Sequence, residues 1–301
     1  MNQSMRKYIK AGLIHFMAFP ETMKGEGPIA ETIGRILRDD YFDAIEITWI
    51  KDDAVRARVR QMLDQSHIAV GYGAQPRLLT TGLNVNDLNE DGREQALQTL
   101  KAGVDEAYAL GAQGFGFLSG KYDPDRLEQS LRALEDSVRE LCAYAAAQGG
   151  LKILLEVFDY DVDKRSLIGP TSLAKAFCER VYDLANFGLM VDLSHVPLQH
   201  ETIEQSLLPI APYVAHAHIG NAVATPGLPA YGDAHPRFGF PGGVNDVNEV
   251  AEYLRTLTRI GYLKEGEPRV VSFEVKPFGG EDPELVIANA KRTLNAAWAM
   301  A

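Results

Sequence analysis

The 301-residue sequence has only two cysteines, Cys142 and Cys178, which are too few for a disulfide framework and do not form a Cys-x-x-Cys pair. Both fall in helix-like segments, so we expect two buried thiols in a reducing compartment. No apolar run approaches the length needed to span a bilayer. The first residues, MNQSMRKYIKAGLI, lack the apolar core and cleavage pattern of a secretion signal. These absences predict a cytoplasmic protein with no membrane partner.

Positive charge is also scarce, because 30 Lys and Arg face 41 Asp and Glu and the net charge is −11. Broad nucleic-acid binding depends on Lys and Arg side chains that meet phosphates. We therefore expect no nucleic-acid partner, although a small anion in a locally positive pocket stays compatible with this balance. The hydrophobic content of 46% is ordinary for a globular protein, so a large core can be buried.

Eight short apolar runs recur along the chain, each bounded by polar residues, Gly or Pro, as strands usually are. They span residues 11–19, 42–50, 67–75, 112–120, 151–159, 187–195, 214–221 and 269–277. Helical periodicity fills the intervals, over residues 29–38, 53–65, 93–110, 123–148, 171–184, 201–210, 247–260 and 282–301. Eight strand–helix units predict the α/β class and a single (β/α)₈ TIM barrel over residues 1–301.

An open, doubly wound sheet is the alternative. That fold usually carries a Gly-rich phosphate turn after its first strand, whereas here the first run leads into AFPETMKGEGP, without a GxGxxG pattern. The one long irregular connection covers residues 221–243. Connections of that length in a compact domain are usually functional, so we expect an active-site loop there.

In a (β/α)₈ barrel the chemistry sits at the carboxyl ends of the strands. The last four runs end in acids and imidazoles, namely Glu156, then Asp192 and His195, then His216 and His218, then Glu274 followed by Lys276. A mixed oxygen and nitrogen set suits a divalent cation. Any one of these acids alone more often joins a structural ion pair. Their coincidence on four successive strands favours a metal site, with His216 two residues deeper as a supporting histidine.

The segments LLEVFD, MVDLSH, AHAHIGN and SFEVKP resemble the xylose isomerase-like TIM-barrel superfamily, which includes sugar and sugar-phosphate isomerases and epimerases, inosose dehydratases and endonuclease IV. The resemblance covers essentially the whole chain. It implies a metal held by Glu156, Asp192, His218 and Glu274, and a substrate contact from His195. The common His-x-Lys-Asp turn of the family is His218-Ile219-Gly220-Asn221 here, so its Lys and Asp are missing.

The segment DAHPRFGFPGG, residues 233–243, is similar to the region where endonuclease IV carries an Asp-x-His pair for an additional zinc. Asp233 and His235 have that spacing, but the other extra ligands are not evident and the acidic balance disfavours a DNA-binding face. We expect Asp233, His235 and Arg237 to form a substrate-side loop; a purely structural role in ordering the connection is an equal alternative.

Other residues near the same rim are candidates for the substrate pocket: His15, Glu46, Trp49 and Tyr72. Each of them can instead be an ordinary core residue. No phosphate cradle of clustered Gly and basic residues is evident, which favours an unphosphorylated sugar or sugar conjugate. Apolar residues of the last segment, such as Trp298 and Met300, are the one indication of a homo-oligomer, and they can equally pack on the barrel.

The resemblance and the carboxylates together predict a sugar isomerase or epimerase that uses one divalent ion, with Mn²⁺ preferred over Mg²⁺, Co²⁺ or Zn²⁺. Glu156 and Glu274 would move a proton α to a carbonyl of a ketose or keto-sugar, assisted by His195. The alternative is a lyase of the inosose dehydratase type, or one that cleaves 3-keto-glycosides or C-glycosides, with His235 or His15 as general acid. An endonuclease-like or non-catalytic barrel is the remaining hypothesis.

Overall fold

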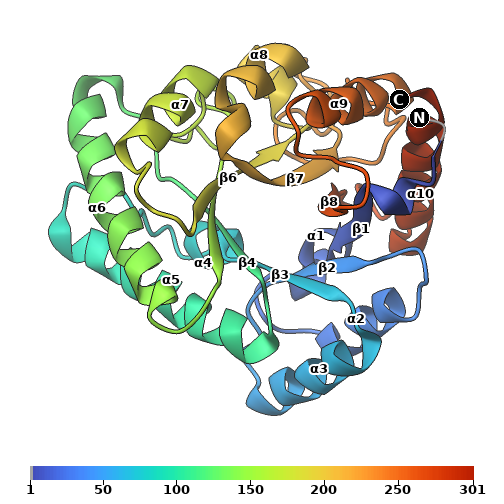
Figure 1. Cartoon of the computed structure of the whole chain (residues 1–301), viewed down its shortest axis with the longest axis horizontal. Helices are drawn as coiled ribbons and strands as arrows, with labels where there is room; N and C mark the ends of the chain where they lie inside the picture. The colour runs from blue at the N-terminus through green and yellow to red at the C-terminus, as the bar shows by residue number, and fades with distance from the viewer. Residues whose placement is uncertain (1–2) are drawn as a thin grey trace.

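Eight parallel strands close into a barrel in the computed structural model, which describes residues 3–301 (Figure 1). Each strand pairs with the next in the sequence, and β8 pairs with β1 to complete the ring. The strands are β1 (Ile9–Ile14), β2 (Ala44–Ile47), β3 (Ala69–Gly73), β4 (Gly114–Leu118), β5 (Lys152–Glu156), β6 (Phe187–Asp192), β7 (Val214–Gly220) and β8 (Arg269–Glu274). The sequence-based prediction of a (β/α)₈ barrel is therefore confirmed.

The longer helices cover the outside of the barrel, as Figure 1 shows, and two short helices, after β1 and β3, lie inside that ring. They are α1 (His15–Ala18), α2 (Ile29–Leu37), α3 (Asp53–Ser66), α4 (Gln75–Leu79), α5 (Glu90–Leu110), α6 (Leu127–Ala146), α7 (Thr171–Arg180), α8 (Ile203–Leu207), α9 (Val247–Arg259) and α10 (Pro283–Met300). Short 3₁₀ turns complete the connections: η1 (Met5–Lys7), η2 (Pro20–Thr22), η3 (Pro124–Arg126), η4 (Val196–Gln199) and η5 (Leu208–Tyr213). Among residues 3–301, none of these helices combines the length and apolarity that a membrane crossing requires.

Side-chain capping fixes where several helices begin. Asp52 accepts a hydrogen bond from the Val55 amide before α3, and Asp246 forms a reciprocal capping box with Glu249 before α9. Asp282 accepts from the Glu284 amide before α10, as the Asp-Pro-Glu sequence predicts. In α7, however, the N-cap residue is Pro170, which has no side-chain acceptor, and the distant Glu201 accepts from the Thr171 amide and hydroxyl instead.

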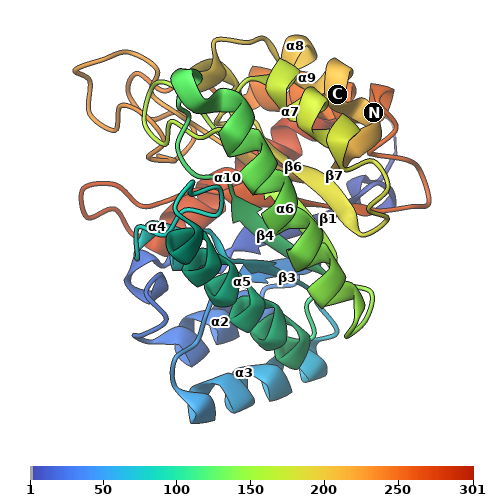
Figure 2. The same cartoon turned by 90° about the vertical axis from the view of Figure 1, so that its left-hand side faces the viewer.

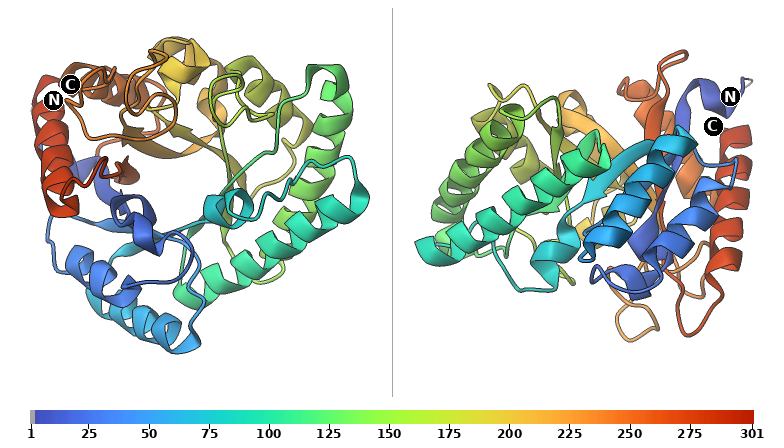
Figure 3. Two further views of the ribbon diagram at one scale, coloured as in Figure 1. Left: turned by 180° about the vertical axis from the view of Figure 1, so that it is seen from behind. Right: turned by 90° about the horizontal axis from the view of Figure 1, so that it is seen from below.

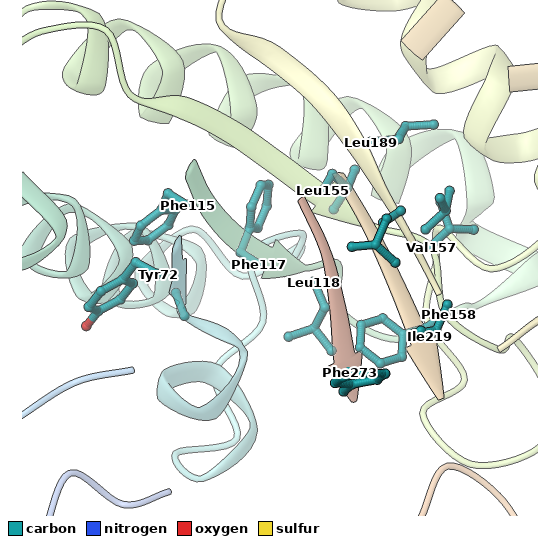
Figure 4. Packing of buried hydrophobic residues seen from close by; sticks show 14 of the residues in the cluster. Tyr72, Phe115, Phe117, Leu118, Leu155, Val157, Phe158, Leu189, Ile219 and Phe273 are labelled. Atoms are coloured by element: carbon teal, nitrogen blue, oxygen red, sulfur yellow. The ribbon is translucent and has the colours of Figure 1, made fainter. Parts of the chain in front are cut away.

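The main core lies between the barrel and its helices. Successive residues of a strand point to opposite faces, so one set of side chains packs outward against the helices and the other fills the barrel. Tyr72 and Phe115, for example, are buried and stack with ring centroids 5.5 Å apart on neighbouring strands (Figure 4). Because both faces of each strand are covered, the strands read as continuous apolar runs.

The connections after the strands gather at one end of the barrel. Figure 2 shows the long connection between β7 and α9, in orange, and the one between β8 and α10, in red, projecting on the same side as α4. Seen from behind in the left panel of Figure 3, the blue and teal segments that follow β1 and β3 lie inside the ring of helices. This end carries the carboxyl termini of all eight strands.

The predicted runs were longer than the strands because the first turn after a strand is also apolar. The run at 11–19 divides into β1 and the short helix α1, and the run at 67–75 ends in the start of α4. Alternation cannot separate a strand from a buried helical turn that follows it directly. The helical segment predicted at 201–210 is α8 followed by the 3₁₀ turn η5, where Pro209 and Pro212 limit regular helix.

Candidate metal centre and pocket

Four side chains from four successive strands meet at the carboxyl end of the barrel. Glu156 ends β5, Asp192 ends β6, His218 lies in β7 and Glu274 ends β8, and one ligand atom from each lies within 4.8 Å of all the others. All four are buried. The sequence-based expectation that these residues come together therefore matches their placement, although their role as metal ligands stays a prediction.

One oxygen of Glu156 lacks a hydrogen-bond donor among the residues that the structure describes. Gln75 Nε2 donates to Glu156 Oε2 over 2.7 Å, while Oε1 is buried and accepts no hydrogen bond from residues 3–301. Burial raises the pKa of Glu156 to about 8, and the neighbouring charge of Glu274 adds to that rise. A buried carboxylate oxygen without a donor is costly unless a cation or a proton satisfies it.

Asp192 is held rigidly by the turn that follows its strand. Its two oxygens accept from the Ser194 amide at 2.8 Å and from the Ser194 hydroxyl at 2.7 Å. Burial and the Glu274 charge raise the pKa of Asp192. Because each carboxylate oxygen has more than one lone pair, these bonds orient the group and leave acceptor capacity that faces the cluster.

His218 is clamped between two carboxylates. Its Nε2 lies 3.1 Å from both oxygens of Glu46, and its Nδ1 lies 2.9 Å from Glu274 Oε2. Carboxylate oxygens only accept, so Nε2 carries the proton that Glu46 accepts. In the neutral ring Nδ1 carries no proton, so its lone pair faces a Glu274 oxygen. Two acceptors that face each other require a cation or a second proton between them. Although burial opposes it, the charges of Glu46 and Glu274 raise the pKa of His218 well above its usual value.

Besides its contact with His218, Glu46 accepts a hydrogen bond from His216, which lies deeper in the barrel. His216 Nε2 lies 2.7 Å from Glu46 Oε1, so one carboxylate supports both histidines of β7. Burial would raise the pKa of Glu46, but His216 and His218 outweigh it and hold that pKa well below its usual value. Glu46, His216 and His218 are close enough for an ion, yet their mutual hydrogen bonds already satisfy them. Sequence reasoning placed Glu46 near the substrate; Glu46 does line the pocket over the cluster, and it also bonds to His218 from below.

Asp233 gathers three cationic or ionisable groups next to the acid cluster. Its Oδ1 lies 3.1 Å from His195 Nε2 and 2.7 Å from His235 Nε2, and its Oδ2 lies 2.6 Å from Lys164 Nζ. Despite burial, these neighbours hold the pKa of Asp233 well below its usual value. The same contact with Asp233, against the effect of burial, raises the pKa of His195 to about 10 and that of His235 to about 9.

The backbone at His235 is unusual and well anchored. Its φ of 49° is in the left-handed region, which costs a non-glycine residue about 1 kcal/mol or more. Lys276, just after β8, donates its amide to the His235 carbonyl over 2.7 Å and so ties the long connection to the barrel rim. His235 Nε2 consequently lies 3.5 Å from Glu274 Oε1. Asp233 and His235 thus line the pocket over the cluster, and a role in substrate binding stays a prediction.

A pocket of about 170 Å³ lies above the four-residue cluster. Its polar lining includes Glu156, His218 and Glu274 of the cluster, together with Glu46, Gln75, Lys164, Asp233, His235 and Lys276. Apolar side chains at or after the ends of β1, β3 and β5 form the rest: Ile14, Phe16, Met17, Met23, Pro76, Leu79 and Phe158. A small, mixed lining of this kind suits a compact polyol with apolar C–H faces.

The sequence matches the family model described as xylose isomerase-like TIM barrel over residues 35–296. The chain belongs to the xylose isomerase-like TIM-barrel family. No curated protein shows significant sequence similarity to it. The resemblance inferred from the strand-end motifs is therefore confirmed at the level of the family.

Solved structures of this fold superpose over almost the whole chain. A D-tagatose 3-epimerase-like protein has a TM-score of 0.72 and 17% identity, with 97% of this chain and 99% of the other covered. D-psicose 3-epimerase from Clostridium cellulolyticum H10 has a TM-score of 0.66 and 20% identity, covering 97% and 98%. The 3-keto-D-glucoside 4-epimerase of E. coli has a TM-score of 0.64 and 18% identity, covering 96% and 98%. At these identities the likeness shows that the xylose isomerase-like fold is shared.

Several residues expected at the substrate lie elsewhere in this xylose isomerase-like barrel. His15 is buried with its Nε2 2.7 Å from Thr32 Oγ1, and Trp49 donates its indole N–H to the Met23 carbonyl. Tyr72 points outward from β3, where its hydroxyl accepts from Arg77 at 2.8 Å. Arg237 pairs with Glu281 at 2.8 Å. None of these four lines the pocket. Strand alternation accounts for Tyr72, since Gly71 and Gly73 take the inward positions.

His195 is adjacent to the pocket but does not line it. Its Nδ1 lies 3.0 Å from the Val157 carbonyl oxygen, and its ring packs 4.3 Å from that of Phe158. Asp233 and Lys164 are the members of its network that reach the pocket. Lys164 is positioned by Asp159, a buried carboxylate that accepts from the backbone amides of Val162, Asp163 and Lys164. Sequence reasoning did not predict that Phe16 and Met17 form an apolar wall of the pocket. The apolar run FMAF after β1 is the sequence signal that could have indicated it.

Proposed function

We propose that this protein is a divalent-metal-dependent epimerase or isomerase of a ketose or keto-sugar. The observation that carries the proposal is the convergence of Glu156, Asp192, His218 and Glu274 at the floor of a pocket, with one Glu156 oxygen unpartnered and the His218 lone pair facing Glu274. Three carboxylates and one imidazole form the hard, mixed donor set that suits Mn²⁺, Mg²⁺ or Co²⁺, with Mn²⁺ preferred.

The donor set fits a cation in charge and in geometry. Buried carboxylates at this spacing repel each other, and the elevated pKa of Glu156 expresses that repulsion together with burial. Glu156, Asp192, His218 and Glu274 would hold the ion, and Gln75, Ser194 and Glu46 would orient three of them. When bound, the ion supplies Lewis-acid stabilisation of negative charge on substrate oxygens.

Proton transfer falls to the two glutamates in this proposal. Glu156 and Glu274 come from β5 and β8, which approach the pocket floor from different sides of the barrel. A sugar carbon held between them would lose its α-proton to one carboxylate and regain a proton from the other on the opposite face. That sequence inverts one stereocentre. Transfer by a single carboxylate between adjacent carbons would instead interconvert aldose and ketose.

The surrounding residues would bind and orient the sugar. Lys164, His235 and Lys276 are cationic or ionisable groups that line the pocket beside the acids, so they would donate to substrate hydroxyls. Phe16, Met17 and Phe158 would cover the apolar faces of the ring and exclude water. A volume of about 170 Å³ favours a single sugar ring over a long oligosaccharide.

The similar structures support the sugar class of the substrate. They are named as ketose 3-epimerases and as a 3-keto-D-glucoside 4-epimerase, all reactions that remove a proton next to a carbonyl. The test is to incubate the protein with Mn²⁺ in D₂O with D-fructose, D-tagatose, D-psicose and a 3-keto-D-glucoside. We expect an isomeric product that carries one deuterium at the inverted carbon, and no product after chelation.

A lyase is the second candidate, because His235 lines the pocket 3.5 Å from Glu274 and could protonate a leaving group. His15, the other proposed acid, is occupied by Thr32 outside the pocket. The same incubation separates the two reactions. A lyase releases water or an aglycone and yields a product of lower mass, whereas an epimerase yields an isomer.

A further inference from the structure

A second and larger cavity, of about 820 Å³, opens at the opposite end of the barrel. It is lined by the first residues of the strands and by the turns that precede them, among them Ala69, Gln113, Tyr213 and Pro268. The interior of a (β/α)₈ barrel is ordinarily filled by layers of branched side chains. A cavity that enters the barrel from the amino-terminal end of the strands is therefore a departure from this packing.

Glycines on the inward face of the strands line this cavity and let neighbouring side chains pack against the strand backbone. Gly71, Gly114 and Gly116 line the cavity, and each occupies a position where other barrels place a side chain. A Cβ atom at Gly71 would lie 2.9 Å from Glu46 Cγ, and one at Gly116 would lie 2.7 Å from Met190 Cε. The cavity extends inward as far as Glu46, Met190 and His216, which also line it.

Three cationic side chains line the cavity: Lys10 of β1, Lys152 of β5 and Arg269 of β8. Lys152 lies four residues before Glu156 and therefore shares its inward face. Lys10 shares a face with Gly12, whose Cβ position would meet Ser272, two residues before Glu274. Both lysines thus point to the barrel interior.

None of these three cations forms an ion pair with an acid among residues 3–301, in a protein of net charge −11. Lys152 Nζ donates to the Ala185 carbonyl over 3.0 Å, and partial burial, followed by the charge of Arg269, lowers its pKa. The cavity contains one carboxylate, Glu46, and that group is already bonded to His216 and His218. The site therefore has an unbalanced positive charge.

We propose that this cavity binds a small organic anion, a carboxylate or a phosphate ester, whose charged group meets Lys10, Lys152 and Arg269. Leu154, Met190 and Tyr213 provide an apolar surface for its carbon skeleton. The site is distinct from the acid cluster, because the layer of Glu46, His216 and His218 separates the two cavities. Glu46 lines both, His216 only this one and His218 only the other. The inference does not depend on the proposed epimerase activity.

The test is isothermal titration calorimetry of the full chain with glycerol 3-phosphate and with succinate, each paired with its neutral counterpart, glycerol and succinamide. We expect at least one anion to bind with a Kd below about 1 mM, and its neutral counterpart not to bind. Comparison of the two anions shows whether phosphate or carboxylate is preferred.

Matched variants locate the binding. Lys152→Met and Lys10→Met keep the length of the side chain and remove its charge, and each should weaken binding at least about tenfold. Arg58→Met, which removes an exposed cation of α3, should leave it unchanged. The proposal is overturned if neither anion binds wild-type protein at 10 mM, if the neutral compounds bind equally well, or if both lysine variants bind like wild type while retaining its melting temperature.

Discussion

Glu46 on β2 supports His218 on the far side of the barrel, with His218 Nε2 3.1 Å from each carboxylate oxygen. This contact places the ring proton on Nε2 and directs Nδ1 toward Glu274, 2.9 Å away. The tautomer of His218, a proposed metal ligand, is thereby set by a residue beneath the site. Glu46 is therefore a positioning residue in this account.

Glu46→Gln should weaken Mn²⁺ binding about 10- to 100-fold, because the neutral amide can present either a donor or an acceptor to His218 and no longer fixes its tautomer. The measurement is a calorimetric Mn²⁺ titration. Glu252→Gln, at an exposed position of α9, is the matched control and should bind like wild type. Equal affinity of Glu46→Gln and wild type would remove the positioning role.

Gln75→Met should lower kcat about 10- to 100-fold, because Glu156 loses the 2.7 Å hydrogen bond that directs its other oxygen to the cluster. Methionine keeps the volume of the side chain, so the fold should persist. Gln61→Met, on the exposed side of α3, serves as the control. Steady-state kinetics on the substrate found by the sugar screen decide the point, and an unchanged kcat would count against it.

Asp159→Ala should lower the free energy of unfolding by about 1–3 kcal/mol, because several backbone amides of the 162–165 turn lose their buried acceptor. The turn carries Lys164 to Asp233, so KM for the sugar should rise as well. Urea unfolding and steady-state kinetics measure the two effects. Asp159→Asn, which keeps one acceptor oxygen, should show a smaller loss; equal stability of the alanine variant and wild type would refute the role of this carboxylate.

His15 should make the protein less stable in acid. Burial lowers the pKa of His15 to about 3, whereas the unfolded chain titrates near 6.5. Between those values the unfolded state binds one more proton, so this residue's contribution falls by about 1.4 kcal/mol per pH unit as the pH drops below 6.5. Urea unfolding of wild type and His15→Gln from pH 7.5 to 4.5 tests this. The difference in stability between them should shrink by that slope in acid, and a constant difference would contradict the assignment.

The fold and the four-residue cluster could be predicted from sequence because both depend on local periodicity. Eight apolar runs give the barrel, and an acid or imidazole at the end of a strand reaches the rim whatever its helices do. Trp49 and Tyr72 were harder to place, since the direction of a side chain depends on where the strand begins, and a shift of one residue reverses it. Glu46 lies inward but is bonded to His216 and His218, contacts between residues 170 and 172 positions apart that no local pattern reveals.

The pocket wall and the opposite cavity depend on tertiary packing. Phe16 and Met17 look like ordinary core residues until α1 is seen to turn over the rim. Gly71 and Gly116 look like weak strand positions, and only the closed barrel shows that Glu46 and Met190 pack closely against them at the edge of the opposite cavity. Lys164 appears solvated in sequence, yet its ammonium group reaches Asp233 in the site.

The most direct test of the account is the metal content of protein purified without chelator, compared with that of Asp192→Asn. Asp136→Asn, an exposed acid of α6, is the matched control. The account predicts about one divalent ion per chain in wild type and in Asp136→Asn, loss of most of it in Asp192→Asn, and sugar turnover that follows metal content. Wild-type protein that binds no divalent ion, even when titrated with Mn²⁺, would contradict the central claim.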